Sequence, residues 1–379
     1  MGEATLDIED PHSLAAYLRD RGISPLEMRV LAGGVSNRTV LVSTVHARWV
    51  IKQALSKLRV PDEWFCSTER VHREALAIQL LQGIEPRGVV PQFVFEDRPN
   101  HILAMEAVAE PHENWKTMLL AGRMDESHFE QFGRLLADLQ SLRPRPEMLS
   151  ELSDRSFFEA LRLAPYYLTS AARVPEAAGF LRDLVARTRE RQDLLVHGDF
   201  SPKNVLVRDG RLTLLDFEVV HMGDAGFDIG FCMAHFLAKY LHLPDRRPAT
   251  LRCIGAFLRA YRDAAGVAFD AGRAASAAAH LIGCLMARVA GRSQLEYLSA
   301  DGKRALQGVA LKLMGSELYD PESVVASFAG DACNSKPEGD GDPRQPRPAD
   351  GEVLVHAGIG RGRMGFGSIG RVHRKSGGD

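Results

Sequence analysis

The chain carries the stretch His197-Gly198-Asp199-Phe200-Ser201-Pro202-Lys203-Asn204, and Leu215-Asp216-Phe217-Glu218 follows it shortly afterwards. Two apolar runs, over residues 205–207 and 212–215, flank an Asp-Gly pair between these two motifs. This pattern is typical of a β-hairpin with a tight turn. Because a hairpin brings its two ends together, the polar side chains of both motifs are expected to converge on one point.

The converging side chains suit a site for a metal ion and a proton. An amide and a carboxylate oxygen, with nucleotide phosphates, are sufficient ligands for Mg²⁺. Asn204 and Asp216 are therefore predicted to hold Mg²⁺, and Asp199 is left to accept the proton of an attacking hydroxyl. His197 is predicted to pack beneath the loop as a structural residue, because Asp199 already fills the role of base. Lys203 could neutralise a transferred phosphate or face solvent.

Composition limits the class of protein. The 379 residues are 45% hydrophobic and 25% charged, which suits a soluble globular protein large enough for two lobes. A formal net charge of -2 argues against nucleic acid or a membrane surface as a partner bound through bulk charge. The five cysteines form no C-x-x-C pair, which favours a reducing cytoplasm over a zinc knuckle or a disulfide framework. The apolar stretch 274–287 is interrupted by His280 and is predicted to be a buried helix, not a membrane span.

Candidate nucleotide contacts lie in the first third of the chain. Paired glycines with Ser and Asn form a predicted turn whose backbone amides could approach a phosphate, although such turns also occur without ligands. The residues of this turn are Gly33, Gly34, Ser36 and Asn37. Lys52 lies among apolar neighbours in a predicted strand, where it either pairs with an anion or reaches solvent from a sheet edge.

A carboxylate and a strand complete this set. Glu74 lies in a segment whose apolar residues recur at helical spacing, and alone it would be read as a solvated carboxylate. Paired with Lys52, it can direct the lysine at the α and β phosphates of ATP. The strand over 101–108 contains Met105 and Glu106; it could present backbone groups to an adenine edge, or be a plain core strand.

The order of elements predicts an α+β protein. Strands dominate the first third, and from Glu113 onwards the pattern becomes helical, with Asp125 as a helix cap. Residues 331–350 are rich in Pro, Gly and charge and are predicted to be disordered. Two G-x-G-x-x-G matches, starting at Gly360 and Gly365, lack the following helix and second strand of a dinucleotide site, so a flexible basic tail is predicted there.

Taken together, these motifs resemble the aminoglycoside phosphotransferase family, over about residues 20 to 320. The resemblance rests on the glycine turn, Lys52, Glu74, the two motifs quoted first, and Phe227-Asp228-Ile229-Gly230. It implies a protein-kinase-like bilobal fold, with a small sheet-rich N-lobe and a larger, mostly helical C-lobe. It also implies ATP and Mg²⁺ as cofactors, Asp199 as catalytic base, Asn204 and Asp216 as metal ligands, and Lys52 as a phosphate contact oriented by Glu74.

The expected division is an N-lobe over 1–108, a C-lobe over 109–327 and a disordered tail over 328–379. Gly198 stands where kinases regulated through an activation loop carry an Arg, and Asp228 follows Asp216 by only twelve positions. The sequence therefore favours a constitutively assembled site that acts on a small molecule. Asp228 could cap a helix or brace the catalytic loop.

The predicted function is ATP-dependent transfer of the γ-phosphate to a hydroxyl of a small molecule, and the alternative is a non-catalytic nucleotide-binding module. Between His221 and Asp320, nine acidic residues face twelve Lys and Arg. This balance of +3 disfavours a polycationic acceptor. A kinase for choline-like or sugar metabolites remains open, with Arg288 and Arg292 as candidate contacts for an anionic or sugar-like acceptor.

Overall fold

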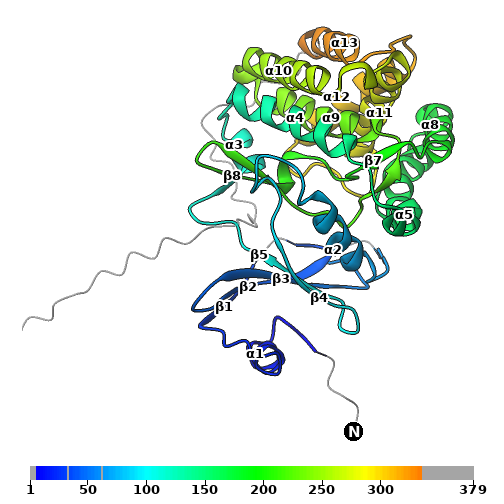
Figure 1. Ribbon diagram of the computed structural model, residues 1–379. Helices are drawn as coiled ribbons and strands as arrows, with labels where there is room; N and C mark the ends of the chain where they lie inside the picture. The colour runs from blue at the N-terminus through cyan, green and yellow to red at the C-terminus, as the bar shows by residue number, and fades with distance from the viewer. Residues whose placement is uncertain (1–5, 32–33, 61–62, 335–379) are drawn as a thin grey trace, which may run out of the picture.

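The computed structural model of the chain describes residues 6–31, 34–60 and 63–334. A five-stranded antiparallel sheet forms the N-terminal lobe, and the C-terminal lobe is mostly helical (Figure 1), as predicted. The elements of the N-terminal lobe are α1 (Pro11–Arg19), β1 (Glu27–Val30), β2 (Asn37–Ser43), β3 (Arg48–Ala54), α2 (Arg70–Leu81), β4 (Phe93–Asp97) and β5 (Ile102–Glu106). The strand order is β1-β2-β3-β5-β4, so β3, which carries Lys52, lies in the centre.

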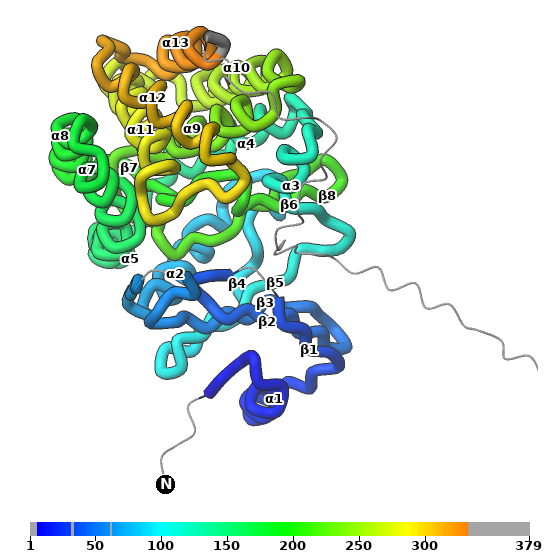
Figure 2. Tube along the Cα trace, turned by 180° about the vertical axis from the view of Figure 1, so that it is seen from behind, coloured from blue at the N-terminus to red at the C-terminus, as the bar shows by residue number. Residues whose placement is uncertain are grey.

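The two faces of this sheet pack on different helices. Side chains alternate along β5: Ile102 and Ala104 belong to a small core with α1, whereas Leu103 and Met105 belong to the main core, which includes α2. Figures 1 and 2 show α1 on the outer face of the sheet and α2 on the face toward the C-terminal lobe. The helix that carries Glu74 thus lies between the sheet and the second lobe.

The C-terminal lobe begins after β5 with short pieces of both kinds of structure. Its strands are β6 (Glu113–Asn114), β7 (Leu194–Val196), β8 (Val205–Arg208), β9 (Arg211–Leu214) and β10 (His221–Gly223). The predicted hairpin is confirmed, because β8 and β9 pair in antiparallel register around the Asp209-Gly210 turn. β6 extends this hairpin to three strands, and β7 pairs with β10 on the other side of the quoted loop.

Helices make up the remainder of this lobe. They are α3 (Trp115–Leu120), α4 (Glu126–Ser141), α5 (Pro146–Ser153), α6 (Ser156–Phe158), α7 (Thr169–Arg173), α8 (Ala178–Glu190), α9 (Gly226–His242), α10 (Arg247–Ala265), α11 (Ala271–Ala290), α12 (Ala300–Met314) and α13 (Pro321–Asn334). Single 3-10 turns lie at Pro175–Ala177, Pro202–Asn204, Pro244–Arg246 and Gly266–Ala268. A π-helix, Glu159–Leu168, joins α6 to α7 and contains Pro165, which cannot donate to a helical hydrogen bond.

Helix pairs form the core of this lobe. α4 packs on α10, and α9 packs on α11. At Gly230 of α9, a Cβ atom would overlap the backbone nitrogen of Leu281 in α11, so only glycine permits this close approach. α11 is the apolar segment that was predicted to be buried, and most of its residues are buried. Within the described ranges, no helix is both long and apolar enough to cross a membrane.

The predicted start of the tail is wrong by several residues. α13 continues through Asn334, so residues 328–334 are helical. Val324, Phe328 and Ala332 recur every four residues and are buried, which is the pattern of a helix face packed on a core. The Pro- and Gly-rich composition that suggested disorder begins only beyond this face. The two G-x-G-x-x-G matches and residues 335–379 lie outside the described residues.

Candidate active site

The loop between β7 and β8 is held in place by Asp228. The two carboxylate oxygens of Asp228 accept hydrogen bonds from the backbone nitrogens of His197 (2.7 Å) and Gly198 (2.9 Å). Asp228 is the third residue of α9, and the residue at the N-cap position is Ala225. The geometry therefore supports the bracing role and not the capping role. Burial raises the pKa of Asp228 to about 7, against the opposing effect of these two hydrogen bonds.

Two further residues fix the shape of this loop. Gly198 has a φ of 76°, and an added Cβ would lie 2.7 Å from the Val219 side chain. His197 is fully buried, and its Nδ1 accepts a hydrogen bond from the backbone nitrogen of Asp199 (3.1 Å). Burial lowers the pKa of His197 to about 4, so its imidazole is neutral at pH 7. These observations agree with a structural role for His197.

Asp199 is buried among donors. Its Oδ2 lies 2.8 Å from Nζ of Lys203, 3.0 Å from Nη2 of Arg162 and 2.9 Å from Nδ2 of Asn204. Burial alone would raise the pKa of Asp199, but attraction to Arg162 and Lys203 outweighs it and lowers the pKa to about 2. Its Oδ1 has no hydrogen-bond partner among the described residues. The carboxylate is thus ionised and oriented through one oxygen, and its second oxygen is left without a partner among the described residues.

Arg162 was not predicted from the sequence. It comes from the π-helix, is buried, and also donates from Nε to the carbonyl oxygen of Gly198 (2.6 Å). It therefore fixes both the backbone and the carboxylate of the loop. An Arg within an otherwise ordinary helical pattern gives no local signal of such a partner. Lys203, for which phosphate contact or solvent exposure was expected, forms an ion pair with Asp199.

The two predicted metal ligands lie on adjacent backbone segments. The backbone nitrogen of Leu215 donates to the carbonyl oxygen of Asn204 (2.8 Å), which places Asp216 next to Asn204. Nδ2 of Asn204 donates to the carbonyl oxygen and Oδ2 of Asp199, so its Oδ1 points away from these bonds. The Asp216 side chain is one-quarter exposed. Asn204 Oδ1 and the Asp216 carboxylate are hard oxygen donors, and this pair, with nucleotide phosphates and water, fits Mg²⁺.

The predicted Lys52–Glu74 pair forms. Nζ of Lys52 lies 2.7 Å from Oε1 of Glu74 and 3.5 Å from Oδ1 of Asp216. Burial opposes the charge on Lys52, but the two carboxylates raise its pKa above the usual value. Burial raises the pKa of Glu74, which the nearby ammonium lowers only in part. Lys52 thus connects the N-terminal lobe to the segment that carries Asp216.

A second ion pair between the lobes was missed. Arg70 of α2 is fully buried, and its Nε lies 3.1 Å from Oε2 of Glu218. Arg70 also donates to the carbonyl oxygens of Ser36 and Leu55. Nδ2 of Asn37 donates to Oε2 of Glu218 (3.2 Å). These contacts tie the predicted glycine turn to the second motif. They occupy the side-chain amide of Asn37, whose nucleotide contact stays a prediction.

The remaining residues that were predicted to contact nucleotide lie in the glycine turn and in β5. Gly33 lies outside the described residues, and Gly34 lies three positions before the start of β2. Met105 is buried in β5 opposite Val50 of β3. The backbone nitrogen of Glu106 donates to the carbonyl oxygen of Gln92, and Glu106 borders a pocket of about 980 Å³ that also contacts α4 and the β8–β9 turn. Nucleotide contact by these residues stays a prediction.

The curated relatives that match this chain include two methylthioribose kinases. One, from Yersinia pseudotuberculosis, is 25% identical over 225 residues, which cover 52% of this chain and 55% of that protein. Another, methylthioribose kinase 2 of Oryza sativa, is 26% identical over 257 residues, which cover 60% of each chain. The chain thus spans little more than half the length of these two relatives.

Comparison with solved structures agrees with the architecture. A protein of Ralstonia eutropha JMP134, provisionally assigned as an aminoglycoside phosphotransferase, superposes with a TM-score of 0.52 at 16% identity. The alignment covers 86% of this chain and 99% of that structure, so the kinase-like fold is shared. The sequence model of the phosphotransferase enzyme family matches residues 27–277. Since that match extends from β1 through the loop of Asp199 and into α11, the chain belongs to the phosphotransferase enzyme family.

Proposed function

We propose that the protein is a kinase that uses ATP and Mg²⁺ to transfer the γ-phosphate to a hydroxyl of a small molecule. The observation that carries the proposal is the environment of Asp199. Three donors hold one of its oxygens, while the other oxygen is buried without a partner among the described residues. A protein that only bound nucleotide would not need a carboxylate with one oxygen fixed and the other left unpartnered. This argues against the alternative of a non-catalytic module.

Positioning dominates the proposed mechanism. Oδ1 of Asp199 accepts a hydrogen bond from the acceptor hydroxyl and directs its oxygen at the γ-phosphorus. A carboxylate whose pKa is lowered to about 2 is a weak base, so it takes the proton only as the hydroxyl oxygen bonds to phosphorus and becomes acidic. Lys52, held by Glu74, binds the α and β phosphates.

Asn204 and Asp216 are the proposed ligands of the metal. Bound Mg²⁺ supplies positive charge that offsets the charge on the phosphate oxygens during transfer. The ion pair between Lys52 and Asp216 keeps the Asp216 carboxylate beside the phosphate-binding lysine before nucleotide enters. Nδ2 of Asn204 donates two hydrogen bonds to Asp199, and these bonds hold the Asp199 carboxylate beside Oδ1 of Asn204.

The test is ADP release across a panel of acceptors, with the Asp199→Ala protein as the blank. The panel contains methylthioribose, which the names of the curated relatives mention, together with aminoglycosides, amino alcohols, sugars and hydroxylated carboxylic acids. Loss of the base should reduce kcat by about 10² to 10⁴-fold, equivalent to about 3 to 5 kcal/mol in the barrier. Affinity for ATP should be largely retained.

A matched control is Asp183→Ala, an exposed carboxylate on α8. It should leave kcat unchanged. Turnover of the Asp199→Ala protein within about threefold of the wild type would remove Asp199 from its assigned role. Binding of Mg·ATP without phosphate transfer to any acceptor, or to water, would favour the nucleotide-binding module.

The acceptor is proposed to carry negative charge, because buried cations collect beyond Arg162. Arg288 donates from Nη1 to the hydroxyl of Tyr166 (3.0 Å), whose ring lies 5.7 Å from the Arg162 guanidinium. The Nε of Arg288 is buried and has no partner among the described residues. Lys239 is buried too, and burial with the charges of Lys116 and Arg288 lowers its pKa to about 7. This cluster of buried cationic side chains favours an anionic acceptor and disfavours a polycationic one.

The acceptor proposal is tested with Arg288→Met. Removal of a charge-assisted hydrogen bond should raise the KM of an anionic acceptor by at least about tenfold. The KM for ATP should stay within about twofold of the wild-type value, since Arg288 is not part of the proposed phosphate contacts. Arg182→Met, which removes an exposed side chain on α8, is the control. An unchanged acceptor KM, or a preference for aminoglycosides, would contradict an anionic acceptor.

A further inference from the structure

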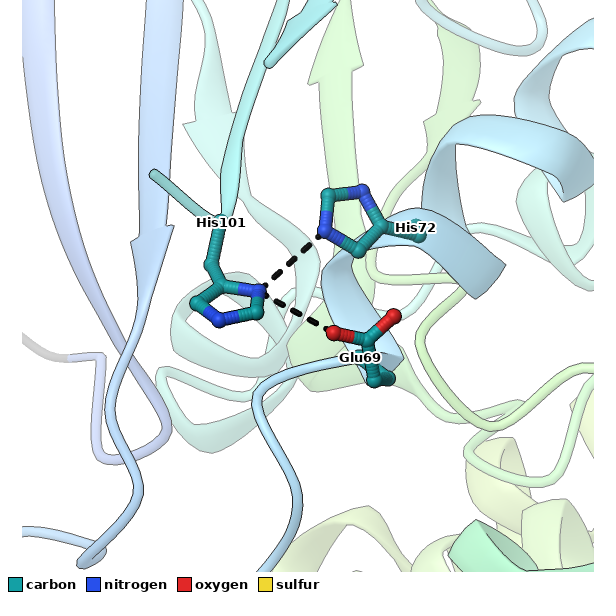
Figure 3. A group of neighbouring side chains, drawn as sticks. All are labelled: Glu69, His72 and His101. Atoms are coloured by element: carbon teal, nitrogen blue, oxygen red, sulfur yellow. Dashed lines mark hydrogen bonds and ion pairs between the residues drawn. The ribbon is translucent and has the colours of Figure 1, made fainter. Parts of the chain in front are cut away.

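Two histidines and one glutamate converge at the start of α2. Glu69 is the residue before the helix, His72 lies in its first turn, and His101 comes directly before β5. Figure 3 shows the three side chains pointing toward one another. Nε2 of His72 lies 3.3 Å from Nδ1 of His101, which lies 3.3 Å from Oε1 of Glu69. All three candidate ligand atoms lie within 4.8 Å of one another.

Two of the three separations match a tetrahedral metal site. Zinc binds imidazole nitrogen at about 2.0 to 2.1 Å, so two ligand atoms of a tetrahedral ion lie about 3.3 Å apart. The His72–His101 and His101–Glu69 separations have this value, and the third pair of ligand atoms lies within 4.8 Å. Two imidazoles with one carboxylate form a known ligand set for zinc, whereas Mg²⁺ prefers oxygen ligands alone.

A fourth residue lies beside His72. The other ring nitrogen of His72, Nδ1, lies 2.6 Å from Oε1 of Glu96, at the distance of an ion pair but without the geometry of a hydrogen bond. Metal-binding histidines commonly direct their second nitrogen at a carboxylate, which fixes the tautomer and leaves the first nitrogen free for the ion. Glu96 is itself held by Arg98, whose Nε lies 3.1 Å from the same oxygen. Glu96 is therefore a positioning residue for this cluster.

We propose that Glu69, His72 and His101 bind one zinc-like divalent ion, with a water molecule at the fourth position. The side chains of Glu69 and His101 are 56% and 34% exposed, so solvent reaches the site. His72 is buried, which anchors the site to the body of α2. The ion is separate from the Mg²⁺ assigned to Asn204 and Asp216, and the proposal does not depend on the kinase function.

The position of the site suggests what the ion does. Glu74 lies two residues after His72 on α2, and the carbonyl oxygen of His101 accepts a hydrogen bond from the backbone nitrogen of Ala54, two residues after Lys52. An ion between His72 and His101 therefore joins the helix that carries Glu74 to the sheet that carries Lys52. Zinc should therefore stiffen the contact between α2 and the sheet, and with it the relative position of Glu74 and Lys52.

The experiment is titration of the full-length, metal-free protein with Zn²⁺ in an isothermal calorimeter, in excess Mg²⁺ to occupy sites built from oxygen ligands. One Zn²⁺ per chain should bind to the wild type, and the wild-type melting temperature should rise with Zn²⁺. His101→Ala should weaken binding at least 100-fold and remove the rise. Glu96→Gln should weaken binding by about 10 to 100-fold, because it changes only the orientation of His72.

Controls separate this site from others. His46→Ala, an exposed histidine elsewhere, and Asp216→Ala should both bind Zn²⁺ as the wild type does. Co²⁺ in place of Zn²⁺ should give the visible absorption of a tetrahedral ion in the wild type and not in His101→Ala. The proposal is overturned if His101→Ala and the wild type bind Zn²⁺ equally, or if the wild type binds none, which would leave the cluster as a hydrogen-bonded group.

Discussion

Nη2 of Arg162 lies 3.0 Å from Oδ2 of Asp199, and Nε of the same guanidinium binds the carbonyl oxygen of the neighbouring Gly198. One buried cation thus sets both the orientation and the charge of the proposed base. Arg162 comes from a π-helix, where the wider turn accompanies a proline that cannot complete the hydrogen-bond ladder. This irregular segment supplies an electrostatic partner that the loop itself lacks.

Replacement of Arg162 should change the pH dependence of the reaction. The pKa of Asp199 is lowered, so the active carboxylate form is lost as pH falls through that pKa. In the wild type, the Asp199 pKa of about 2 lies below the pH of any workable assay, so this loss of the active form is not seen. In Arg162→Met, burial is less opposed and the pKa should rise by about 1 to 3 units. We expect kcat/KM of Arg162→Met, divided by that of the wild type, to decline at the acid end of a profile from about pH 4 to pH 9.

Arg182→Met, on the exposed face of α8, is the control for this profile. The substitution of Arg162 should also lower kcat at least tenfold at pH 8, because a misdirected carboxylate no longer positions the hydroxyl. Superimposable pH profiles together with an unchanged kcat would show that Lys203 and Asn204 orient Asp199 without help from Arg162.

Asp228 should make stability depend on pH in the opposite sense. Burial raises its pKa to about 7 in the folded protein, above the value of 3.8 for the free side chain. Between these values the folded state holds a proton that the unfolded state has released, so the contribution to stability falls as pH rises toward 7. An Asn at this position does not titrate. The free energy of unfolding of the wild type, relative to Asp228→Asn, should therefore decrease from pH 5 to pH 8.

The measurement is denaturant unfolding of both proteins at each pH, with Asp183→Asn on α8 as a control for the loss of an exposed charge. Asp228→Asn should also reduce kcat, because an amide cannot accept from the backbone nitrogens of both His197 and Gly198 as the carboxylate does. A difference in unfolding free energy that stays constant across this pH range would exclude the raised pKa.

Arg70 should matter for stability more than any exposed arginine. Arg70→Met removes the cation beside the buried Glu218 carboxylate and the donors to several backbone carbonyl oxygens. Leaving a buried charge unpaired typically destabilises a protein by about 3 to 5 kcal/mol. Urea unfolding should show a loss of this size, and the double variant with Glu218→Gln should recover part of it. A loss below about 1 kcal/mol would mean that Glu218 finds another partner or solvent.

The local parts of this site could be predicted from the sequence. The Asp209-Gly210 pair between apolar runs determines the hairpin, and the hairpin brings Asn204 next to Asp216. The Lys52–Glu74 pair could be anticipated as one of two outcomes, because a lysine within a predicted strand either pairs with an anion or reaches solvent from a sheet edge. A short-range rule of turn chemistry was enough for the hairpin, whereas the ion pair also needed the central position of β3 in the sheet.

The long-range contacts could not be predicted in the same way. Arg70 and Glu218 are 148 positions apart, and each reads on its own as a surface charge. Arg162 lies in a segment with an ordinary helical pattern, and only tertiary packing places it against Asp199. The cluster of Glu69, His72 and His101 depends on how α2 lies against β5. The start of the tail was misplaced because composition hid the four-residue spacing of Phe328 and Ala332.

Removal of the Asp216 carboxylate should abolish the metal-dependent part of nucleotide binding. In the wild type, Mg²⁺ is expected to tighten ATP binding through Asn204 and Asp216. In Asp216→Ala, this gain should disappear, while ATP without metal still reaches Lys52, which keeps its 2.7 Å contact with Glu74. Calorimetric titration of ATP with and without Mg²⁺ measures both quantities, and Asp209→Asn in the exposed hairpin turn is the control. If Mg·ATP affinity were the same in Asp216→Ala as in the wild type, Asp216 would not be a ligand of the metal.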